Sequence, residues 1–390
     1  MKNKKISIIR FLALLTILCL LIVFNLIGCN ILGSAAKEES EVTEEESEVT
    51  EETQQEEMQN ESADETEAAE EAEEEGSIKN LEITGSINPL NGFEISDTVK
   101  SGRPIAVMIE NSPDSRPQSG LINADIVFEI VDEYGVTRYV GVFSSIDAEI
   151  MGPVRSARIY YAEIARSFDP IYVFWGTYPD AYPVIKDMDM DVLDANSDAY
   201  VPYTNAGWRD RTRSDVTEHT AFIDIQGIKE DAESFGYSLE GGQSPMRFKL
   251  DAVESERGTI NDIVVNFSYN EYEASFIYDA DTNSYLKTTA GAPHIDFESG
   301  KQLSLNNVIV MITNIDGPID QYGHMVVRTT GTHEADTAYY FMDGNMIEGT
   351  WGRTSIFDPF EFKDLEGNPI LFNRGSTWVC LVQGVDRLSY

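Results

Sequence analysis

The sequence is poor in basic residues, with 28 Lys and Arg against 68 Asp and Glu and a formal net charge of −40. Because affinity for phosphate backbones depends on clustered Lys and Arg, this balance excludes a general nucleic-acid binder. Twenty of the acidic residues lie between positions 38 and 75, and the 48 acidic and 23 basic residues that follow leave −25. A body this acidic is expected to be soluble and to repel anionic lipid.

Cysteine is also scarce, at positions 19, 29 and 380. If Cys19 leaves with a signal peptide and Cys29 is acylated, the mature chain has no pair of thiols for an internal disulfide. Cys380 lies in the apolar run 378–382, which favours a buried core thiol over a reactive one.

Several common catalytic motifs are absent, including G-x-S-x-G, G-x-x-x-x-G-K-[ST], H-E-x-x-H and G-x-G-x-x-G. The usual hydrolase, NTPase, zinc-peptidase and dinucleotide interpretations therefore have no local support. The four histidines show no ligand spacing, so we predict no metal site and no cofactor.

The N-terminus has the pattern of a lipoprotein signal peptide. Four basic residues precede an apolar run from Phe11 to Ile27, and Gly28-Cys29 follows. Cleavage after residue 28 would leave Cys29 as the lipidation site, carrying palmitate-type acyl chains that hold the protein on the outer face of the bacterial cytoplasmic membrane. The alternative is an uncleaved membrane helix, for which 17 residues fall short of the ~20 usually needed.

Residues 29–92 have the composition of an acidic, disordered stalk, and ESEVTEE occurs twice in them. We interpret the stalk as a spacer rather than an acidic interaction tail. About 60 flexible residues span roughly 45 Å, and more when like charges extend the chain. The folded body would then lie away from the membrane, within reach of the inner cell wall.

Residues 93–245 are predicted to form an α/β domain. Strands are expected at 103–109, 125–131 and 137–143, and the last two form a hairpin. Tyr160, Ile164 and Phe168 have helical spacing before the apolar run 171–175, so 139–175 is a plausible β-α-β unit. Loops 144–154 and 176–183 would then share the edge where such domains bind ligands.

Arg155 and Arg158 are placed by this prediction in the first turn of the helix, on one face. Cations are unfavourable there, so an anion should compensate them. That anion is either a bound phosphate or carboxylate, or one of the chain's own carboxylates, of which Asp125, Glu129, Asp132 and Glu133 are nearby.

The predicted ligand-binding set comprises Arg155 and Arg158, with Arg138, Asp180 of loop 176–183 and Arg209. Arg209 belongs to the basic stretch 208–213, the densest in the acidic body. His219 follows this stretch and is either a hydrogen-bonded structural residue or, with Glu129, a catalytic acid or base.

Residues 255–390 are predicted to form a β-rich domain, a sandwich or a barrel, with short strands alternating with turns. His294 and Asp296 would point to the same face of a strand and make a His–carboxylate pair. Such a pair alone forms neither a metal site nor a catalytic triad. His324 and His333 are interpreted as turn or surface residues.

Several motifs together resemble the YerB-like bacterial lipoproteins, which pair an N-terminal and a C-terminal domain of unknown function. They include RPIAVMIEN at 103–111, RPQSGL at 116–121, GPVRSAR at 152–158 and GNMIEGTW at 344–351. The resemblance covers roughly residues 95–388 and implies two domains in the cell envelope, without an established reaction. At the position before His219 the family typically has proline, whereas this chain has Glu218.

Two main functional hypotheses follow. The first is a membrane-tethered, extracytoplasmic binding or accessory protein, whose N-terminal cleft holds an anionic group of a cell-wall component or of another envelope protein. The second is a cell-envelope hydrolase or transferase that uses Glu129 or His219. A solute receptor for a transporter is a further alternative, although it needs two similar α/β lobes, which the β-rich second half disfavours.

Overall fold

The computed structural model describes residues 81–95, 102–144, 149–196 and 200–390. The predicted signal peptide, Cys29 and most of the predicted stalk lie outside the described residues. Within the described ranges, no helix has the length and apolar character needed to cross a bilayer. We call the described part of the chain the body.

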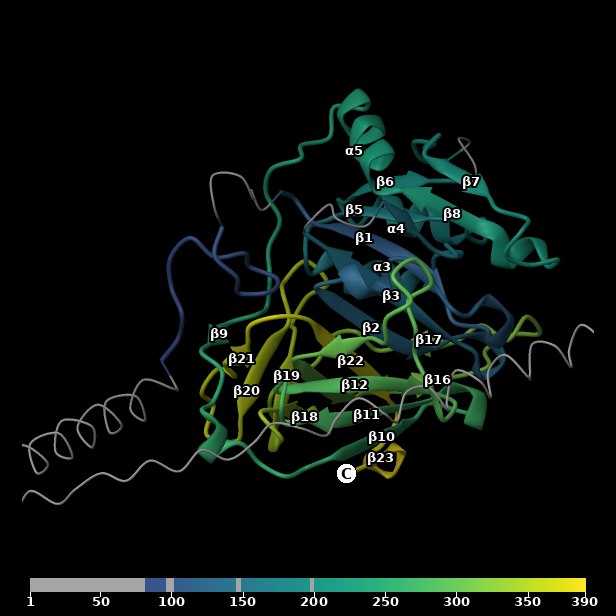
Figure 1. Ribbon diagram of the computed structural model, residues 1–390. Coiled ribbons are helices and arrows are strands. Elements are labelled where there is room, and N and C mark those ends of the chain that lie inside the picture. Colours follow the sequence, from purple (N-terminus) through teal and green to yellow (C-terminus); the bar gives the residue numbers. More distant parts are fainter. Residues whose placement is uncertain (1–80, 96–101, 145–148, 197–199) are drawn as a thin grey trace, which may run out of the picture. The chain divides into compact units, whose positions relative to one another are not determined.

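A ten-stranded sheet runs through the body (Figure 1). Its strands, in spatial order, are β20 (Glu361–Asp364), β19 (Asn345–Gly352), β18 (Thr337–Met342), β15 (Asn307–Ile312), β22 (Thr377–Val382), β2 (Ile126–Val131), β3 (Thr137–Phe143), β1 (Ile105–Glu110), β5 (Ile171–Phe174) and β6 (Asp191–Asp194).

The two segments predicted as separate domains meet in the middle of this sheet. Strand β22 pairs in parallel with β2, with Val127 opposite Trp378 and Glu129 opposite Cys380. Backbone hydrogen bonds therefore join the segments directly. The body does not consist of two similar lobes about a hinge, which removes the main structural support for a solute receptor.

In the N-terminal segment, the predicted hairpin of β2 and β3 is confirmed by their antiparallel pairing. The predicted β-α-β unit is wrong, because β1 lies between β3 and β5, antiparallel to the first and parallel to the second. The α/β class is thus met only in part, by parallel β1, β5 and β6 with the short α-helices of the described residues: α3 (Ile159–Arg166), α4 (Ala181–Lys186) and α5 (Ile225–Ser234).

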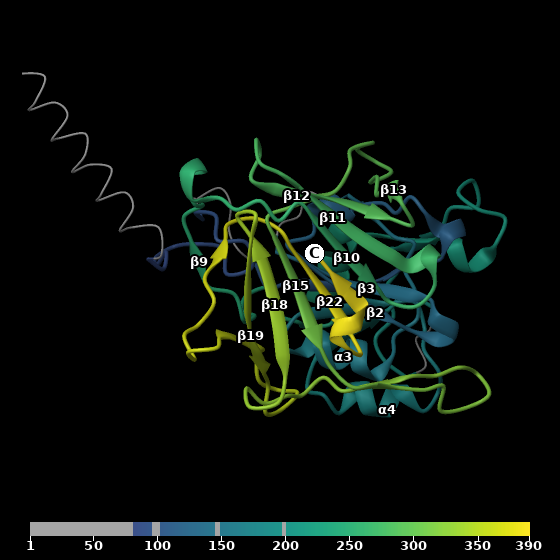
Figure 2. The ribbon, with the colours of Figure 1, turned by 90° about the horizontal axis from the view of Figure 1, so that it is seen from below.

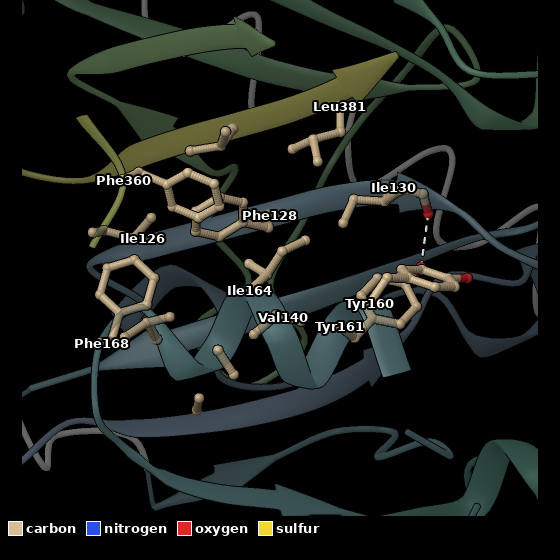
Figure 3. Packing of buried hydrophobic residues seen from close by; sticks show 14 of the residues in the cluster. Ile126, Phe128, Ile130, Val140, Tyr160, Tyr161, Ile164, Phe168, Phe360 and Leu381 are labelled. Carbon is tan, nitrogen blue, oxygen red and sulfur yellow. Dashed lines mark hydrogen bonds between the residues drawn. The ribbon is translucent and has the colours of Figure 1, made fainter. Parts of the chain in front are cut away.

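Helix α3 packs against one face of the sheet, with its predicted apolar stripe inward (Figure 3). The Tyr161 hydroxyl donates to the Ile130 carbonyl at 2.8 Å. Phe128 lies edge-on to Phe168 and stacks on Phe360, both at 5.8 Å between centroids. Burial of each such ring contributes roughly 1.5–3 kcal/mol, so residues from both segments stabilise one core.

The C-terminal segment is β-rich, as predicted. A second sheet covers the other face of the ten-stranded sheet (Figure 2). The core between the two sheets includes Ile263 and Phe276 of the second sheet and Val310 and Phe341 of the ten-stranded sheet. The second sheet has a path of five strands and one further strand. Its strands are β13 (Ala292–Pro293), β12 (Ser284–Thr289), β11 (Glu273–Asp279), β10 (Asp262–Asn266) and β23 (Leu388–Ser389), with β14 (Ser304–Leu305) also paired to β12.

Short elements complete the body. The small sheets consist of β16 (Ile315–Asp316) with β17 (Val326–Val327), β21 (Phe372–Asn373) with β9 (Phe248–Lys249), and β4 (Ile150–Met151), β8 (Ala221–Asp224) and β7 (Gly207–Arg209). The 3-10 helices are η1 (Pro113–Ser115), η2 (Leu121–Asn123), η3 (Glu133–Gly135), η4 (Thr217–Thr220), η5 (Glu254–Glu256), η6 (Asn270–Tyr272) and η7 (Val385–Arg387).

The end of the predicted stalk lies on the body instead of remaining free. Leu90 is fully buried, the Ile83 amide donates to the Phe248 carbonyl at 2.7 Å, and the Asn91 side chain donates to Asp125 at 2.6 Å. Residues 81–92 therefore belong with the fold. They contain apolar side chains that can be buried, which the acidic sequence before them lacks. Cys380 is buried as expected, and burial raises the pKa of its thiol.

Candidate functional site

A cavity of about 750 Å³ lies beside the carboxyl end of β1 and is lined by both segments. We call it the cleft and define it by Glu110, Ser112, Glu133, Tyr134, Val136, Arg138, Arg155, Arg158, Tyr178, Pro179, Asp180, Asp320, Tyr322 and His324. Its volume falls in the ~300–1,000 Å³ range of small-molecule sites. We predicted a cleft formed by the N-terminal segment alone. In the structure, the loop between β16 and β17 supplies three residues of the cleft, Asp320, Tyr322 and His324.

Residues 155–158 lie across the ends of β1 and β5. The Arg155 amide donates to the Met108 carbonyl at 3.0 Å, and the Trp175 amide donates to the Arg155 carbonyl at 2.9 Å. Helix α3 begins only at Ile159, and its N-cap Arg158 has extended backbone angles. The prediction that both arginines occupy the first helical turn is therefore wrong, although both line the cleft.

Two of the cleft arginines are neutralised by the protein's own carboxylates. Arg138 contacts Asp132 at 2.7 Å and Glu133 at 3.1 Å, and Arg158 also pairs with Glu133. Burial opposes ionisation of Asp132, but Arg138 and Arg158 outweigh it and hold the pKa of Asp132 below its usual value. Burial likewise opposes the charge of Arg138, yet Asp132 and Glu133 raise its pKa.

Arg155 is less completely matched. Its Nε lies 3.3 Å from Glu110 Oε1 but makes no hydrogen bond, and a quarter of the side chain is exposed. Burial lowers the pKa of Arg155, Glu110 opposes that shift, and the neighbouring Arg138 adds to it. Of the three predicted arginines, Arg155 is the one whose charge an external anion would stabilise most.

Aromatic rings form the rim of the cleft. Tyr134 and Tyr322 are 68% and 62% exposed, and the Tyr178 ring lies 4.9 Å from the ring of His324. His324 Nδ1 lies 2.6 Å from Asp320 Oδ2, and its Nε2 lies 3.8 Å from Glu133. His324 therefore connects the β16–β17 loop with the N-terminal segment. Exposed tyrosines provide flat surfaces for a ligand at low entropic cost.

The other predicted binding residues separate in space. Asp180 lines the cleft as the exposed N-cap residue of α4. Arg209 does not belong to the lining: it lies on β7, stacks on Trp175 at 4.6 Å and donates to the Thr217 carbonyl. Three arginines and four carboxylates line the cleft, so its charges are balanced rather than strongly positive.

Glu129 is completely buried in the joint between the segments. It accepts hydrogen bonds from Thr137 at 3.0 Å and Trp378 at 3.1 Å, and its Oε2 lies 3.6 Å from the fully buried Lys287. Burial lowers the pKa of Lys287, and Glu129 opposes that shift. Because none of its surface is exposed, Glu129 presents no atom to a substrate in this structure.

His219 has a different position. It lies in η4, is nearly buried, and its Nδ1 donates to Glu110 Oε2 at 2.8 Å. Glu110 thus contacts both His219 and Arg155. The histidine itself lines a smaller cavity next to the cleft.

The predicted His294–Asp296 pair does not form. His294 contacts Gln118 and Thr289, each at 2.9 Å, while Asp296 accepts from the Gly120 amide at 2.7 Å. Burial and the neighbouring Lys287 lower the pKa of His294 well below its usual value. Both residues therefore fasten the second sheet to the loop 116–121. Within the described ranges no group of three His, Cys, Asp or Glu side chains could hold a metal ion.

Sequence reasoning missed Glu110, Tyr134, Tyr178 and the loop 320–324. Glu110 ends a correctly predicted strand, and its place at a ligand edge was the available signal. The loop carried no such signal, because its role depends on contact with residues nearly 200 positions away.

Comparisons with known proteins cover both halves of the cleft. The N-terminal domain described as "Protein of unknown function (DUF3048)" matches residues 90–238, and the C-terminal domain of that description matches 263–379. "Putative lipoprotein YerB" of Bacillus subtilis (strain 168) is 28% identical over 314 residues, 77% of this chain and 87% of the relative. The crystal structure of YerB from Bacillus subtilis has a TM-score of 0.66 at 28% identity and covers 78% of this chain and 98% of that one. All residues that line the cleft lie within the matched ranges.

Proposed function

Since this chain belongs to the YerB-like family of proteins with paired DUF3048 domains, we propose that it is a lipid-anchored, extracytoplasmic binding protein whose cleft takes an envelope ligand with an anionic group. The observation that carries the proposal is Arg155: its Nε is buried without a hydrogen bond, whereas Arg138 and Arg158 each lie within 4 Å of two carboxylates.

The ligand that fits best carries one anionic group and a flat or apolar portion. Arg155 would bind the anionic group with its two terminal nitrogens, and Tyr134, Tyr178 and Tyr322 would contact the remainder. Four carboxylates in the lining disfavour a polyanion, because each would repel it. Cell-wall peptide fragments with a free carboxylate have this combination.

The test is a titration of the full-length chain, purified in detergent, with soluble wall peptides whose carboxylates are free or amidated. We expect Arg155→Ala to weaken binding of the free-carboxylate form by about 10- to 100-fold, because a charge-assisted hydrogen bond contributes ~1.5–3 kcal/mol. Arg209→Ala is the matched control, since it removes an arginine outside the cleft. Equal binding by wild type and Arg155→Ala would contradict the proposal.

The membrane anchor is tested separately. We expect Cys29→Ser to abolish acylation and move the protein from the membrane fraction into the soluble one, because acyl chains supply the membrane affinity. Mass spectrometry of the N-terminal peptide identifies the modification directly. An unmodified Cys29 in a membrane-bound protein would instead favour an uncleaved helix.

A catalytic role is the second candidate, and it depends on His219, since Glu129 is sealed in the core. His219 is oriented by a carboxylate, as histidine bases often are. The described residues place no activated nucleophile within hydrogen-bonding distance of it, so binding remains the better-supported function.

A further inference from the structure

A second cavity, of about 200 Å³, lies next to the cleft. We call it the small cavity and define it by Asp114, Ser115, Arg116, Pro117, Pro153, Thr212, Arg213, His219, Phe222 and Phe297. The Glu110–His219 hydrogen bond of 2.8 Å separates it from the cleft, because Glu110 lines one cavity and His219 the other. Its volume is below the ~300 Å³ of sites that enclose a whole small molecule, so it suits one compact group.

The small cavity has an unusual charge for this chain. Arg116, Arg213 and His219 line it with a single carboxylate, that of the exposed Asp114. The chain as a whole has more than two acidic residues for every basic one. Glu110 and Glu298 pair with His219 and Arg213 from outside the lining, so the cationic groups that face the small cavity favour an anion there without a net excess of positive charge around it.

Arg213 forms a fixed wall of the small cavity. Its guanidinium lies 3.4 Å from the ring centroid of Phe297 and 4.8 Å from that of Phe222. Its terminal nitrogens donate to Ser119 Oγ at 3.0 Å and to the Pro117 carbonyl at 2.9 Å. Burial lowers the pKa of Arg213, and Glu298 opposes that shift from 3.5 Å. This cation is therefore rigidly placed, with Glu298 as its carboxylate partner.

Two other side chains retain nitrogens without a hydrogen bond. Arg116 uses Nε and Nη2 to bind Asn111 and the Glu271 carbonyl, each at 2.8 Å, which leaves Nη1 without a partner among the described residues. His219 uses Nδ1 to bind Glu110, and its Nε2 is likewise unpaired within the described part of the chain. Glu110 is itself held by Ser112 at 2.7 Å, so the imidazole ring is fixed in orientation.

We propose that the small cavity is a second binding site, distinct from the cleft, for a phosphate group. In its imidazolium form, protonated at both ring nitrogens, His219 donates from Nε2–H to the phosphate oxygens while Nδ1–H stays on Glu110; Arg116 donates from Nη1, and Arg213 supplies further positive charge. A compact tetrahedral anion with several acceptors matches two separate donors and a fixed cation. The proposal does not depend on ligand binding in the cleft, because Arg155 belongs only to the latter.

The experiment uses the full-length chain in detergent and isothermal titration with inorganic phosphate or with glycerol phosphate, which distinguish free phosphate from a phosphate ester. We expect His219→Gln to weaken binding of the accepted form at least 10-fold with an unchanged melting temperature. His333→Gln, at a partly exposed histidine paired with Glu361 and far from the small cavity's lining, should bind within about 2-fold of wild type.

A second measurement needs no variant. Diethyl pyrocarbonate modifies accessible imidazoles, and peptide mass spectrometry reports each histidine separately. We expect phosphate to protect His219 and to leave His324, in the cleft, and His333 reactive. The proposal is wrong if neither phosphate compound binds at millimolar concentration, if His219→Gln binds like wild type, or if protection falls on His324 instead of His219.

Discussion

The Glu129–Lys287 pair and the Glu110–Arg155 pair are each formed by one carboxylate and one cation, yet their surroundings differ. Glu129 and Lys287 are completely inaccessible, and the ring centroid of Trp378 lies 4.5 Å from Lys287 Nζ. Glu110 is nearly as buried, but Arg155 reaches the cleft with a quarter of its side chain exposed. The type of residue therefore does not distinguish a structural charge from one available to a ligand, whereas access to a cavity does.

The largest expected effect is at the sealed pair. Lys287→Met should lower the free energy of unfolding by about 3–5 kcal/mol, because it leaves Glu129 buried without its cation. Urea denaturation followed by tryptophan fluorescence measures the loss. The double variant Glu129→Gln with Lys287→Met should recover part of it, since neither charge then remains. Equal losses in the single and double variants would mean that the pair is not energetically coupled.

A smaller, pH-dependent effect is expected at Asp132, the buried partner of the cleft residue Arg138. Asp132→Asn should cost about 2 kcal/mol at neutral pH, because Arg138 then keeps a single carboxylate partner, Glu133, beside the Ser156 carbonyl. The folded-state pKa of Asp132 is below its unfolded value, so its contribution is complete above about pH 5 and is lost as pH falls through the folded pKa.

The corresponding measurement is the unfolding free energy between about pH 6 and pH 2. Wild type should lose more stability over this range than Asp132→Asn. Asp210→Asn is the comparison for a surface carboxylate: Thr212 lowers the pKa of Asp210 as well, but in a solvated turn, so its curve should depart from wild type less than that of Asp132→Asn. Parallel curves for wild type and Asp132→Asn would show that Arg138 and Arg158 do not favour the ionised form.

These two regions also show what the sequence could predict. The strands and the α3 stripe follow from local patterns, and the acidic residues expected near the arginines included the true partners, Asp132 and Glu133. The helix start was placed too early because residues 153–157 make their hydrogen bonds elsewhere. The Pro153 carbonyl accepts from Glu110, and the Ala157 amide donates to Gly176. Such pairing between distant segments has no local signature.

The position of β1 between β3 and β5 is another non-local feature, and it overturned the β-α-β unit. The cleft nevertheless forms where the arginines were expected, since residues 155–158 return to the carboxyl ends of β1 and β5. The contribution of the β16–β17 loop depends on the sheet that joins both segments through β22 and β2. No motif or periodicity in the sequence predicts the pairing of β22 with β2.

Arg155 should separate stability from binding. Arg155→Ala is expected to change the free energy of unfolding by no more than about 1 kcal/mol, since Glu110 retains Ser112 and His219 as partners. The same variant should lose ligand affinity in the cleft, as described above. Thermal unfolding beside the binding titration provides the check. A loss of several kcal/mol would place Arg155 with Lys287 among the structural charges.

The smallest stability effect is expected at the rim. Tyr134→Phe removes only the exposed hydrogen bond from the hydroxyl to the Gln321 carbonyl at 3.2 Å, so the free energy of unfolding should change by less than about 0.5 kcal/mol. Tyr134 has a φ of 57°, which glycine adopts without strain, and Tyr134→Gly should regain some of the energy lost with the ring. If the ring contacts ligand, Tyr134→Gly weakens binding severalfold and Tyr134→Phe does not. Similar binding by both variants would restrict recognition to the deeper residues around Arg155.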